Sequence, residues 1–400
     1  MKKVCVVILS AMCILALAMP MYAVHVTSPA AIVMDFETGD ILFERNIHTA
    51  RVPASTTKAM TAFVVYEEIA AGNLTMDTLV QISANASRIA SDSNMQGAPF
   101  ALAAGSYHTV DTLLQLAMLP SSNGANVALA EHISGTEAEF AIKMNEVAYS
   151  IGMFSAFTNS HGALPHYTNA YSLALLTRTF IQRHPDILRI TGAATMQFQG
   201  RTVANTNLLL HSAWRYAGAD GFRTGTTREA GFCLISTAYR DGRRMIVVVM
   251  GAANNDGRYG DTHRLLDFGF AEAARRDAER PLTISLDGYD MALDVAPQMV
   301  NSNAMIPLRP LFEALEWTVD WVVETSTAIL AYAEYSYVRT AVGNRTIYVN
   351  HSQHILDIPA QIIDGRMFVP WQFLAYILPN QQQAVLWDEV ARVVEIHNVY

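Results

Sequence analysis

The sequence predicts an α+β fold for the first two thirds of the chain, followed by a small repeat domain. Strand patterns at residues 31–36 and 41–44, and again at 232–239 and 245–250, enclose a long stretch with helical periodicity. Strands at both ends of such a stretch are typical of an antiparallel sheet assembled from distant parts of the chain, with helices between them. An internal repeat after residue 280 indicates the second domain.

The elements of the α+β part follow one another in a simple order. Turn residues at 37–40 join the first two strands into a hairpin. Asp241-Gly242 joins the second pair of strands, and a closing helix is expected over 261–274. Helices are predicted between the two strand pairs, at 55–72, 111–119, 124–132, 138–151 and 172–183.

The repeat places the predicted domain boundaries. Residues 300–309 resemble residues 363–372, and each copy continues through a short helix into a strand that carries a tryptophan. Two copies of this β-α-β unit are expected to form a domain over residues 281–400. The charged residues 275–280 are interpreted as a linker, so the first domain is expected to span residues 24–275.

Residues 1–23 have the pattern of a secretory signal peptide. Lys2 and Lys3 precede an apolar run from Val4 to Met19, and Ala23 provides a small residue for cleavage. We therefore expect export to the extracellular space or the cell wall, with cleavage near Ala23. A retained N-terminal anchor is the alternative, although the run is short for a membrane span.

Composition and motifs argue against a nucleic-acid partner, an intramolecular disulfide and a metal site. The chain has 27 Lys and Arg against 36 Asp and Glu, a formal net charge of −9 without a basic block, which argues against nucleic acid. Beyond the signal segment only Cys233 remains, so no intramolecular disulfide is possible there. His161 and His166 do not form a metal-binding motif and are interpreted as loop residues. No metal and no cofactor are predicted.

Ser55 and Lys58 are the first candidates for catalysis. Three residues apart at the start of a helix, their side chains lie on the same face. A serine hydroxyl needs a base to take its proton, and a lysine can be that base when burial and nearby positive charge lower its pKa. The free N–H groups of a first helical turn can also stabilise an oxyanion.

Two further stretches, in order along the chain, restrict the interpretation. Ser55–Lys58 is followed by Ser121-Ser122-Asn123 and then by Arg223-Thr224-Gly225. This set resembles the penicillin-binding proteins and class A β-lactamases, and its context over residues 30–270 resembles the low-molecular-mass D-alanyl-D-alanine carboxypeptidases. The matching context comprises residues 35–39, 53–61, 119–123, 144–145, 161–164, 205–207 and 220–231. The resemblance implies a penicillin-binding/β-lactamase-like serine transpeptidase fold.

The resemblance also implies catalytic functions for three residues. Ser55 would attack the carbonyl between two D-alanines of a peptidoglycan stem peptide and form an acyl-enzyme. Lys58 would accept the proton of Ser55, and Ser121 would relay a proton to the leaving amine. β-Lactams would acylate Ser55 as mimics of the substrate and inhibit the enzyme.

Substrate binding is implied for residues of the second and third stretches. Asn123 would bind the substrate backbone and orient Lys58, and the backbone N–H groups of Ser55 and Thr226 would form the oxyanion hole. Thr224 and Thr226 would contact the substrate carboxylate beside Gly225, with Arg223 supplying positive charge.

Arg223 departs from the family pattern, which usually has lysine at this position. An arginine keeps the positive charge and can bind a carboxylate in bidentate fashion, but it does not easily donate a proton. Two alternatives therefore stay open, a D,D-endopeptidase acting on cross-links and a catalytically weak protein that binds the cell wall. A β-lactamase would need a deacylating glutamate between the second and third stretches, and none is evident.

The C-terminal domain resembles the copper-amine-oxidase-like stalk modules of secreted proteins, and we predict no copper in it. It could serve as a spacer or contact the cell wall. Its tryptophans, Trp317, Trp321, Trp371 and Trp387, are expected to pack in the core of the domain, with a sugar-stacking surface as the alternative.

Overall fold

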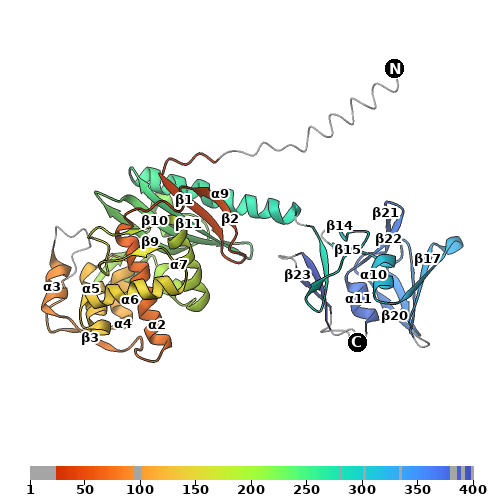
Figure 1. The fold of residues 1–400 in the computed structure, drawn as a ribbon, viewed down its shortest axis with the longest axis horizontal. Helices are drawn as coiled ribbons and strands as arrows, with labels where there is room; N and C mark the ends of the chain where they lie inside the picture. The colour runs from red at the N-terminus through yellow and green to blue at the C-terminus, as the bar shows by residue number, and fades with distance from the viewer. Residues whose placement is uncertain are drawn as a thin grey trace, which may run out of the picture. The chain divides into compact units, whose positions relative to one another are not determined.

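The computed structural model describes residues 24–92, 101–279, 281–300, 303–332, 336–378, 385–388 and 392–397. The predicted signal segment lies outside the described residues. The chain divides into two compact units, one up to Ala273 and one from Ala274 onward, and Figure 1 shows the elements of each. No helix among the described residues is long and apolar enough to cross a membrane.

A five-stranded antiparallel sheet forms the centre of the first unit. Its strand order is β2-β1-β11-β10-β9, so the strands at the beginning of the chain pair with those near residue 250. This confirms the prediction of a sheet assembled from distant segments. The strands are β1 (Ala30–Asp35), β2 (Ile41–Arg45), β9 (Ala219–Thr227), β10 (Gly231–Arg240) and β11 (Arg243–Ala252).

Both faces of the sheet are buried. In β1, Ile32 and Met34 belong to the large core that contains most of the helices, whereas Ala31 and Val33 face the core formed with α9 (Asn255–Glu279). This alternation follows from the two-residue period of a strand. The sheet therefore lies between α9 and the other helices of the unit (Figure 1).

The helices between the strand pairs agree closely with the predicted segments. They are α2 (Lys58–Ala70), α3 (Ala84–Ser91), α4 (Val110–Met118), α5 (Asn123–Ser134), α6 (Glu137–Ser150), α7 (Ala170–Arg183) and α8 (Ile187–Thr191). Three two-stranded antiparallel sheets lie among them: β3 (Leu79–Gln81) with β4 (Tyr107–Thr109), β5 (Ser155–Ala156) with β6 (Tyr167–Thr168), and β7 (Thr195–Phe198) with β8 (Arg201–Ala204). Helices α3 and α8 are the two helices of this group that the sequence analysis did not predict.

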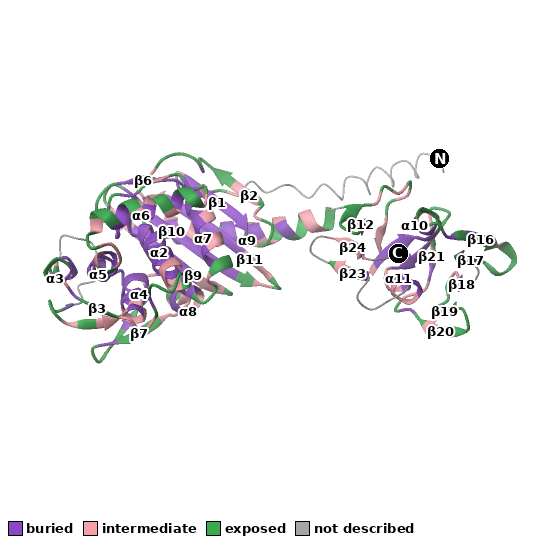
Figure 2. Cartoon of the chain, turned by 60° about the horizontal axis from the view of Figure 1, so that its bottom comes forward, coloured by how far each residue is buried: buried purple, intermediate pink, exposed green. Residues whose placement is uncertain are grey.

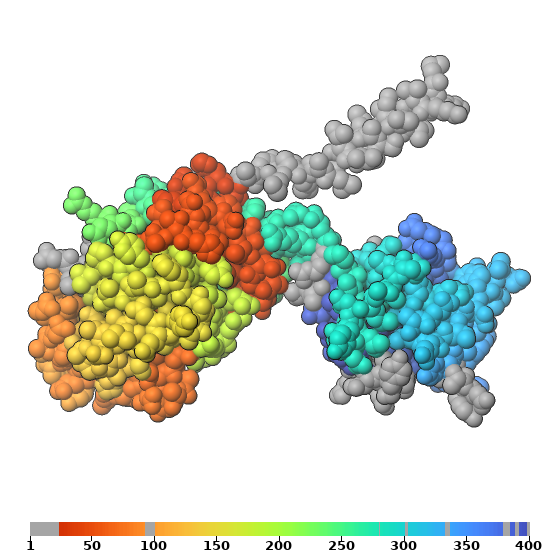
Figure 3. All heavy atoms as spheres, viewed as in Figure 1, coloured from red at the N-terminus to blue at the C-terminus, as the bar shows by residue number. Residues whose placement is uncertain are grey.

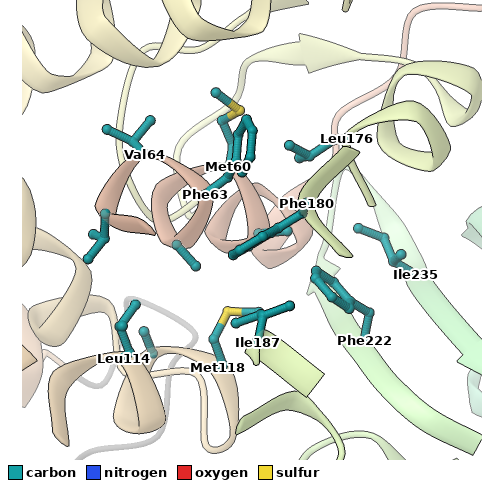
Figure 4. Packing of buried hydrophobic residues seen from close by; sticks show 14 of the residues in the cluster. Met60, Phe63, Val64, Leu114, Met118, Leu176, Phe180, Ile187, Phe222 and Ile235 are labelled. Carbon is teal, nitrogen blue, oxygen red and sulfur yellow. The ribbon is translucent and has the colours of Figure 1, made fainter. Parts of the chain in front are cut away.

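Helix α2 is the centre of the helical region. All its residues from Lys58 to Tyr66 are buried, which is typical of a helix surrounded by protein. Figure 4 shows Phe63 of α2 beside Phe180 of α7, with ring centroids 5.1 Å apart. Buried residues continue from α2 into the strands of the sheet (Figure 2). In the space-filling view, the orange and yellow segments of the helical region pack against each other (Figure 3).

The predicted linker is wrong in one respect. Residues 275–279 are helical and form the end of α9, which begins at Asn255 rather than near 261. The segment contains no glycine or proline, and Arg275 pairs with Glu279 one turn later, an arrangement that stabilises an exposed helix end.

Beyond the end of α9, the described part of the second unit consists of short strands with helices α10 (Leu308–Ala314) and α11 (Gln372–Ile377) between them. Strands β12 (Thr283–Leu286) and β13 (Tyr289–Asp290) form a sheet with β23 (Val385–Asp388) and β24 (Val393–Ile396). A five-stranded sheet follows α10, and it contains β16 (Thr318–Val322), β17 (Thr327–Tyr332), β18 (Ser336–Ala341), β19 (Thr346–Val349) and β20 (Ser352–Ile355). The short turn η4 (Val323–Thr325) joins the first two of these strands.

The predicted repeat appears as two hairpins that pair with each other. Strands β14 (Gln298–Val300) and β15 (Asn303–Pro307) form the first, and β21 (Gln361–Ile363) and β22 (Arg366–Pro370) form the second. Equivalent residues Ile306 and Val369 face each other in the antiparallel β15–β22 pair, so the copies are related by a local two-fold axis. Helix α11 occupies in the second copy the place of α10 in the first.

Candidate active site

Ser55 lies in a short 3-10 turn, η1 (Ala54–Thr57), and α2 begins only at Lys58. The prediction had placed Ser55 in the first turn of the α-helix itself. Two threonine side chains account for the tighter turn, since Thr56 Oγ1 donates to Pro53 O at 2.7 Å and Thr57 Oγ1 donates to Ala54 O at 2.8 Å. Ser55 is 5% exposed, so its hydroxyl lies in a largely enclosed position.

Lys58 lies at the centre of the site. Its Nζ is 2.9 Å from Ser55 Oγ, 2.7 Å from Asn123 Oδ1 and 2.6 Å from the backbone oxygen of His161. The side chain is fully buried. Burial, and then the positive charge of Arg223, lower the pKa of Lys58 well below its usual value.

The lowered pKa favours a neutral amine, and the three contacts accommodate one. Asn123 Oδ1 and the oxygen of His161 can only accept hydrogen bonds, so both protons of a neutral amine go to them. The remaining lone pair then faces Ser55 Oγ and can accept its proton. The geometry provides a serine nucleophile in direct contact with a base.

Asn123 begins helix α5, and Ser122 caps that helix through a bond from Ala125 N to its hydroxyl. The side-chain oxygen of Asn123 accepts from Lys58, so the side-chain nitrogen of Asn123 points away from Lys58. That nitrogen is buried and has no hydrogen-bond partner among the described residues. Because a buried unpaired donor is costly, the amide is a natural site for a carbonyl oxygen of a bound peptide.

Ser121 is held by Arg223 rather than by Lys58. Arg223 Nη2 donates to Ser121 Oγ, and Ser121 has a φ angle of 73°, in the left-handed region. Backbone strain of this kind, in a non-glycine residue, is often found at active sites. The proton of the Ser121 hydroxyl stays available because the oxygen acts as an acceptor toward Arg223.

The strain at Ser121 leads to a prediction about two variants. Both Ser121→Ala and Ser121→Gly remove the hydroxyl and its bond to Arg223, but only glycine tolerates a φ of 73° without a steric cost. We therefore expect Ser121→Gly to be more stable than Ser121→Ala, with a free energy of unfolding that is higher by about 1 kcal/mol. Denaturant unfolding of the two proteins measures this difference, and equal stabilities would contradict it.

Most of the N–H groups of Arg223 bind other groups of the protein. Its side chain is 1% exposed, with Nε 3.3 Å from Ser55 O and Nη1 2.7 Å from Met118 O and 3.1 Å from Thr206 Oγ1, in addition to Ser121. Four of its five N–H groups are therefore used, and the bidentate grip on a carboxylate that the sequence suggested is not available in this geometry. Burial, and then the charge of Arg258, lower the pKa of Arg223 to about 9, which leaves its charge intact at neutral pH.

Thr224, Gly225 and Thr226 follow Arg223 along the edge strand β9, beside η1. A Cβ atom on Gly225 would lie 2.8 Å from Pro53 O and 3.0 Å from Ser55 N, so only glycine lets the two backbones approach this closely. The strand and the turn that carries the nucleophile are thereby held against each other. Seven of the eight predicted site residues thus lie on η1, α2, β9 or α5, and Ser121 lies in the short loop between α4 and α5.

Two residues of this region were missed by the sequence analysis. Arg258 of α9 is 5% exposed, and its Nη1 donates to Thr226 Oγ1 at 3.2 Å and to Gly225 O at 3.4 Å. Thr206 Oγ1 accepts from Thr224 Oγ1 at 2.7 Å and from Arg223. Thr206 lies in the matching stretch 205–207, which could have identified it, whereas nothing in the sequence marks Arg258.

The loop after α6 contains two buried histidines: His166 binds Thr57 through its ring, and His161 binds Lys58 through its backbone oxygen. Thr57 Oγ1 already donates to Ala54 O, so His166 Nε2, 2.7 Å away, must be the donor to it. His166 Nδ1 then accepts from the side-chain amide of Asn159. Burial lowers the pKa of His166 to about 4, and burial, with Lys58 and His166, lowers the pKa of His161 to about 3.

These histidines predict a loss of stability in acid. The unfolded chain takes up a proton on each near pH 6.5, whereas the folded protein keeps them neutral until about pH 4 and 3. Stability contributed by the neutral forms is therefore complete above pH 6.5 and is lost as the pH falls below it, by up to about 1.4 kcal/mol per pH unit for each histidine. Denaturant unfolding at pH 7 and at pH 5 measures this effect. The free energy of unfolding should decrease less between the two pH values in His166→Gln than in the wild type, and an equal decrease would contradict this account.

Comparison with known proteins agrees with this geometry. The sequence profile of the D-alanyl-D-alanine carboxypeptidases matches residues 18–254, more than half of the chain. The chain belongs to this family of serine peptidases. The profile of the copper amine oxidase N-terminal domain matches residues 285–396. Both resemblances predicted from the sequence are confirmed.

Individual members of the family are moderately similar to this chain. The D-alanyl-D-alanine carboxypeptidase DacF of Bacillus subtilis is 33% identical over 251 residues, which cover 61% of this chain and 62% of that protein. This chain therefore spans less than two thirds of the length of the curated relative.

Solved structures confirm the predicted penicillin-binding fold. Penicillin-binding protein D2 of Listeria monocytogenes, solved with ampicillin bound, is 29% identical with a TM-score of 0.53 and is matched over 62% of this chain and 98% of its own. The peptidoglycan synthesis regulatory factor PBP3 of Streptococcus pneumoniae is 29% identical with a TM-score of 0.59, over 62% of this chain and 72% of its own.

His161, His166 and Cys233 are candidate metal ligands by residue type, and in the structure each has other contacts or is buried. Within the ranges given above, no group of three or more His, Cys, Asp or Glu side chains is arranged to hold a metal ion. His161 and His166 are engaged with Glu137, Thr57 and Asn159 as part of the loop. Cys233 is buried in the sheet, where burial raises the pKa of its thiol to about 11.

Proposed function

We propose that this protein is a penicillin-sensitive serine D-alanyl-D-alanine carboxypeptidase that removes the terminal D-alanine from peptidoglycan stem peptides. The observation that carries the proposal is the contact between Ser55 Oγ and the buried Lys58 Nζ, in a chain of the carboxypeptidase family. A relative of known structure binds ampicillin, which supports β-lactams as inhibitors.

The positions of the side chains support the following course for the proposed reaction. Ser55 Oγ attacks the carbonyl carbon of the penultimate D-alanine, while its proton passes to the lone pair of Lys58. The Asn123 amide holds a carbonyl of the stem peptide, and the N–H groups of Ser55 and Thr226 stabilise the oxyanion. Ser121 passes a proton to the leaving amine, D-alanine departs, and the proton taken up by Lys58 restores the Ser121 hydroxyl. Water then hydrolyses the acyl-enzyme, and one of its protons restores the hydroxyl of Ser55.

The substrate carboxylate is placed near Thr226. Thr224 Oγ1 lies 2.7 Å from Thr206, and the Thr226 hydroxyl accepts from Arg258, so its own proton can be donated to the carboxylate. Arg223 and Arg258 add two buried positive charges to this end of the site. Arg223 contributes to substrate binding through its positive charge and to catalysis through its hydrogen bond to the Ser121 hydroxyl. It does not bind the substrate carboxylate directly.

We also propose that the protein is exported and that the second unit contacts the cell wall. The pattern of Lys2, Lys3 and the apolar run to Met19 supports export with cleavage near Ala23. The N-terminal sequence of the protein secreted by an expressing cell tests this. A sequence beginning near Val24 is expected, and a full-length protein held in the membrane would overturn it.

The activity is tested by D-alanine release from a soluble peptide that ends in D-Ala-D-Ala, together with labelling by a fluorescent penicillin. Release and labelling, both lost in Ser55→Ala, are expected. Labelling with very slow release, and faster release in Arg223→Lys, would favour the weak wall-binding protein. Cleavage of cross-linked dimers in preference to the linear peptide would favour the D,D-endopeptidase.

A further inference from the structure

The second unit contains a cleft that its own core packing does not explain. The cleft lies between α10, β16 and the turn of the β21–β22 hairpin, and has a volume of about 510 Å³. Ligand sites in proteins typically have volumes of about 300–1,000 Å³. All its lining residues belong to the second unit.

One wall of the cleft is the side chain of Trp321. The expectation of core packing is confirmed for Trp317, which is buried, while Trp371 and Trp387 are partly buried against the same hydrophobic cluster. Trp321 is 39% exposed and lies outside that cluster. Its partner across the β16–β17 ladder is Ala328, whose small side chain does not cover the indole.

The floor of the cleft is apolar and its rim is charged. Leu308, Val319 and Ala328 line it and are buried. The rim carries Arg309, Glu313, Asp294, Asp320 and Arg366, and Arg309 pairs with Glu313 at 2.8 Å. A ligand in the cleft would therefore meet an aromatic wall, an apolar floor, and hydrogen-bond donors and acceptors together.

The charges of the rim narrow the choice of ligand. Its three carboxylates outnumber its two arginines, and the chain as a whole has a formal net charge of −9, so an anionic polymer is disfavoured. A ligand without net charge, with an apolar face and many polar groups at its edge, fits the lining best. A pyranose sugar with an N-acetyl group has this combination.

The second repeat differs from the first at the equivalent position. Trp387 is the repeat equivalent of Trp321 and packs against the hydrophobic cluster. Gln372, the equivalent of Arg309, donates to Asp357 Oδ2 at 2.7 Å. Among the described residues, the tryptophan and the residue equivalent to Arg309 therefore have different surroundings in the two copies.

We propose that this cleft binds an uncharged N-acetylated sugar unit of the glycan strand of peptidoglycan, stacked on Trp321. The choice of polymer rests on the proposed function, since the stem peptides cut at Ser55 are attached to that strand. The apolar face of the sugar lies on the indole, and its hydroxyl and acetamido groups meet Arg366, Arg309 and the acidic side chains.

The proposal is tested with the full mature chain and N-acetylated chitotetraose as the probe, by isothermal titration calorimetry. The wild type is expected to bind chitotetraose and to bind cellotetraose, which lacks acetamido groups, several-fold more weakly. Trp321→Ala should weaken binding by about tenfold or more, and Arg366→Ala should weaken it measurably. Thermal unfolding confirms that each variant is folded.

Tyr348→Ala is the matched control. Tyr348 is 40% exposed and lies next to the buried Ile347 on β19, so it points to the opposite face of the same sheet. Its substitution should change binding by less than about twofold. Absence of chitotetraose binding, equal binding of cellotetraose, or an equal loss in Tyr348→Ala and Trp321→Ala would overturn the proposal.

The D-alanine release assay separates this proposal from the proposed function. Trp321→Ala should release D-alanine from the soluble peptide at the wild-type rate, because that peptide contains no sugar. Normal release without sugar binding would overturn the cleft proposal alone. Sugar binding without release would overturn the proposed function and leave the sugar site in place.

Discussion

Replacing Lys58 with methionine should lower the rate of penicillin acylation by about a thousandfold or more. The substitution keeps most of the side-chain volume but removes the lone pair that faces Ser55 Oγ at 2.9 Å. It also leaves Asn123 Oδ1 and the oxygen of His161 without their donor. Stopped-flow or gel-based labelling with a fluorescent penicillin measures the rate.

Lys143→Met is the matched control for this variant. Lys143 lies on α6 and pairs with Glu68 in a partly exposed ion pair, away from Ser55. We expect it to be acylated at the wild-type rate. Acylation of Lys58→Met within about tenfold of the wild type would show that another group takes the proton of Ser55.

The acylation rate should also depend on pH in a defined direction. A protonated Lys58 has no lone pair, so the rate falls as the pH drops through the pKa of Lys58 and reaches a plateau above it. Burial and Arg223 lower that pKa, so the plateau is expected to begin well below the usual pKa of a lysine. A rate that rises only above pH 10 would contradict this.

Gly162→Ala should have the largest effect on stability, about 3 kcal/mol or more. Gly162 has a φ angle of 76°, and a Cβ atom there would lie 1.9 Å from Ala54 O and 2.5 Å from Ala54 C. The clash pushes η1 away from the loop whose His161 oxygen binds Lys58. We expect loss of penicillin labelling together with a lower free energy of unfolding, measured by denaturant titration.

Gly152→Ala separates the clash from the backbone strain. Gly152 has nearly the same φ angle, 75°, but a Cβ atom there would meet nothing within 4 Å. It should therefore cost only about 1 kcal/mol and leave labelling unchanged. Similar losses of stability in the two variants would show that the close approach to Ala54 is unimportant.

The sequence was sufficient for the elements that have strong periodic patterns. The hairpin of β1 and β2, the strands β10 and β11, and helices α2, α4, α5, α6 and α7 appear within a few residues of their predicted bounds. Ser55, Lys58 and Asn123 could be selected because their spacing and order in the chain are characteristic. The structure brings these three side chains into direct contact through Lys58.

Other features depend on contacts that no local pattern encodes. Strand β9 contains Gly221, Arg223 and Gly225, a poor strand composition, and it extends because it pairs with β10 and abuts η1. Acceptors from three distant segments take up four of the five N–H groups of Arg223. That Arg223 cannot bind a carboxylate in bidentate fashion is therefore visible only in three dimensions. Arg258 approaches Thr226 from a helix on the other face of the sheet.

The most direct test of the account is the site of covalent modification by a β-lactam. The purified protein is incubated with penicillin, its intact mass is measured, and the modified peptide is mapped. We predict one equivalent of adduct, located on Ser55, formed by the wild type and absent in Ser55→Ala. An adduct on another residue, or none at all under conditions in which the protein is folded, would contradict the assignment of Ser55 as the nucleophile.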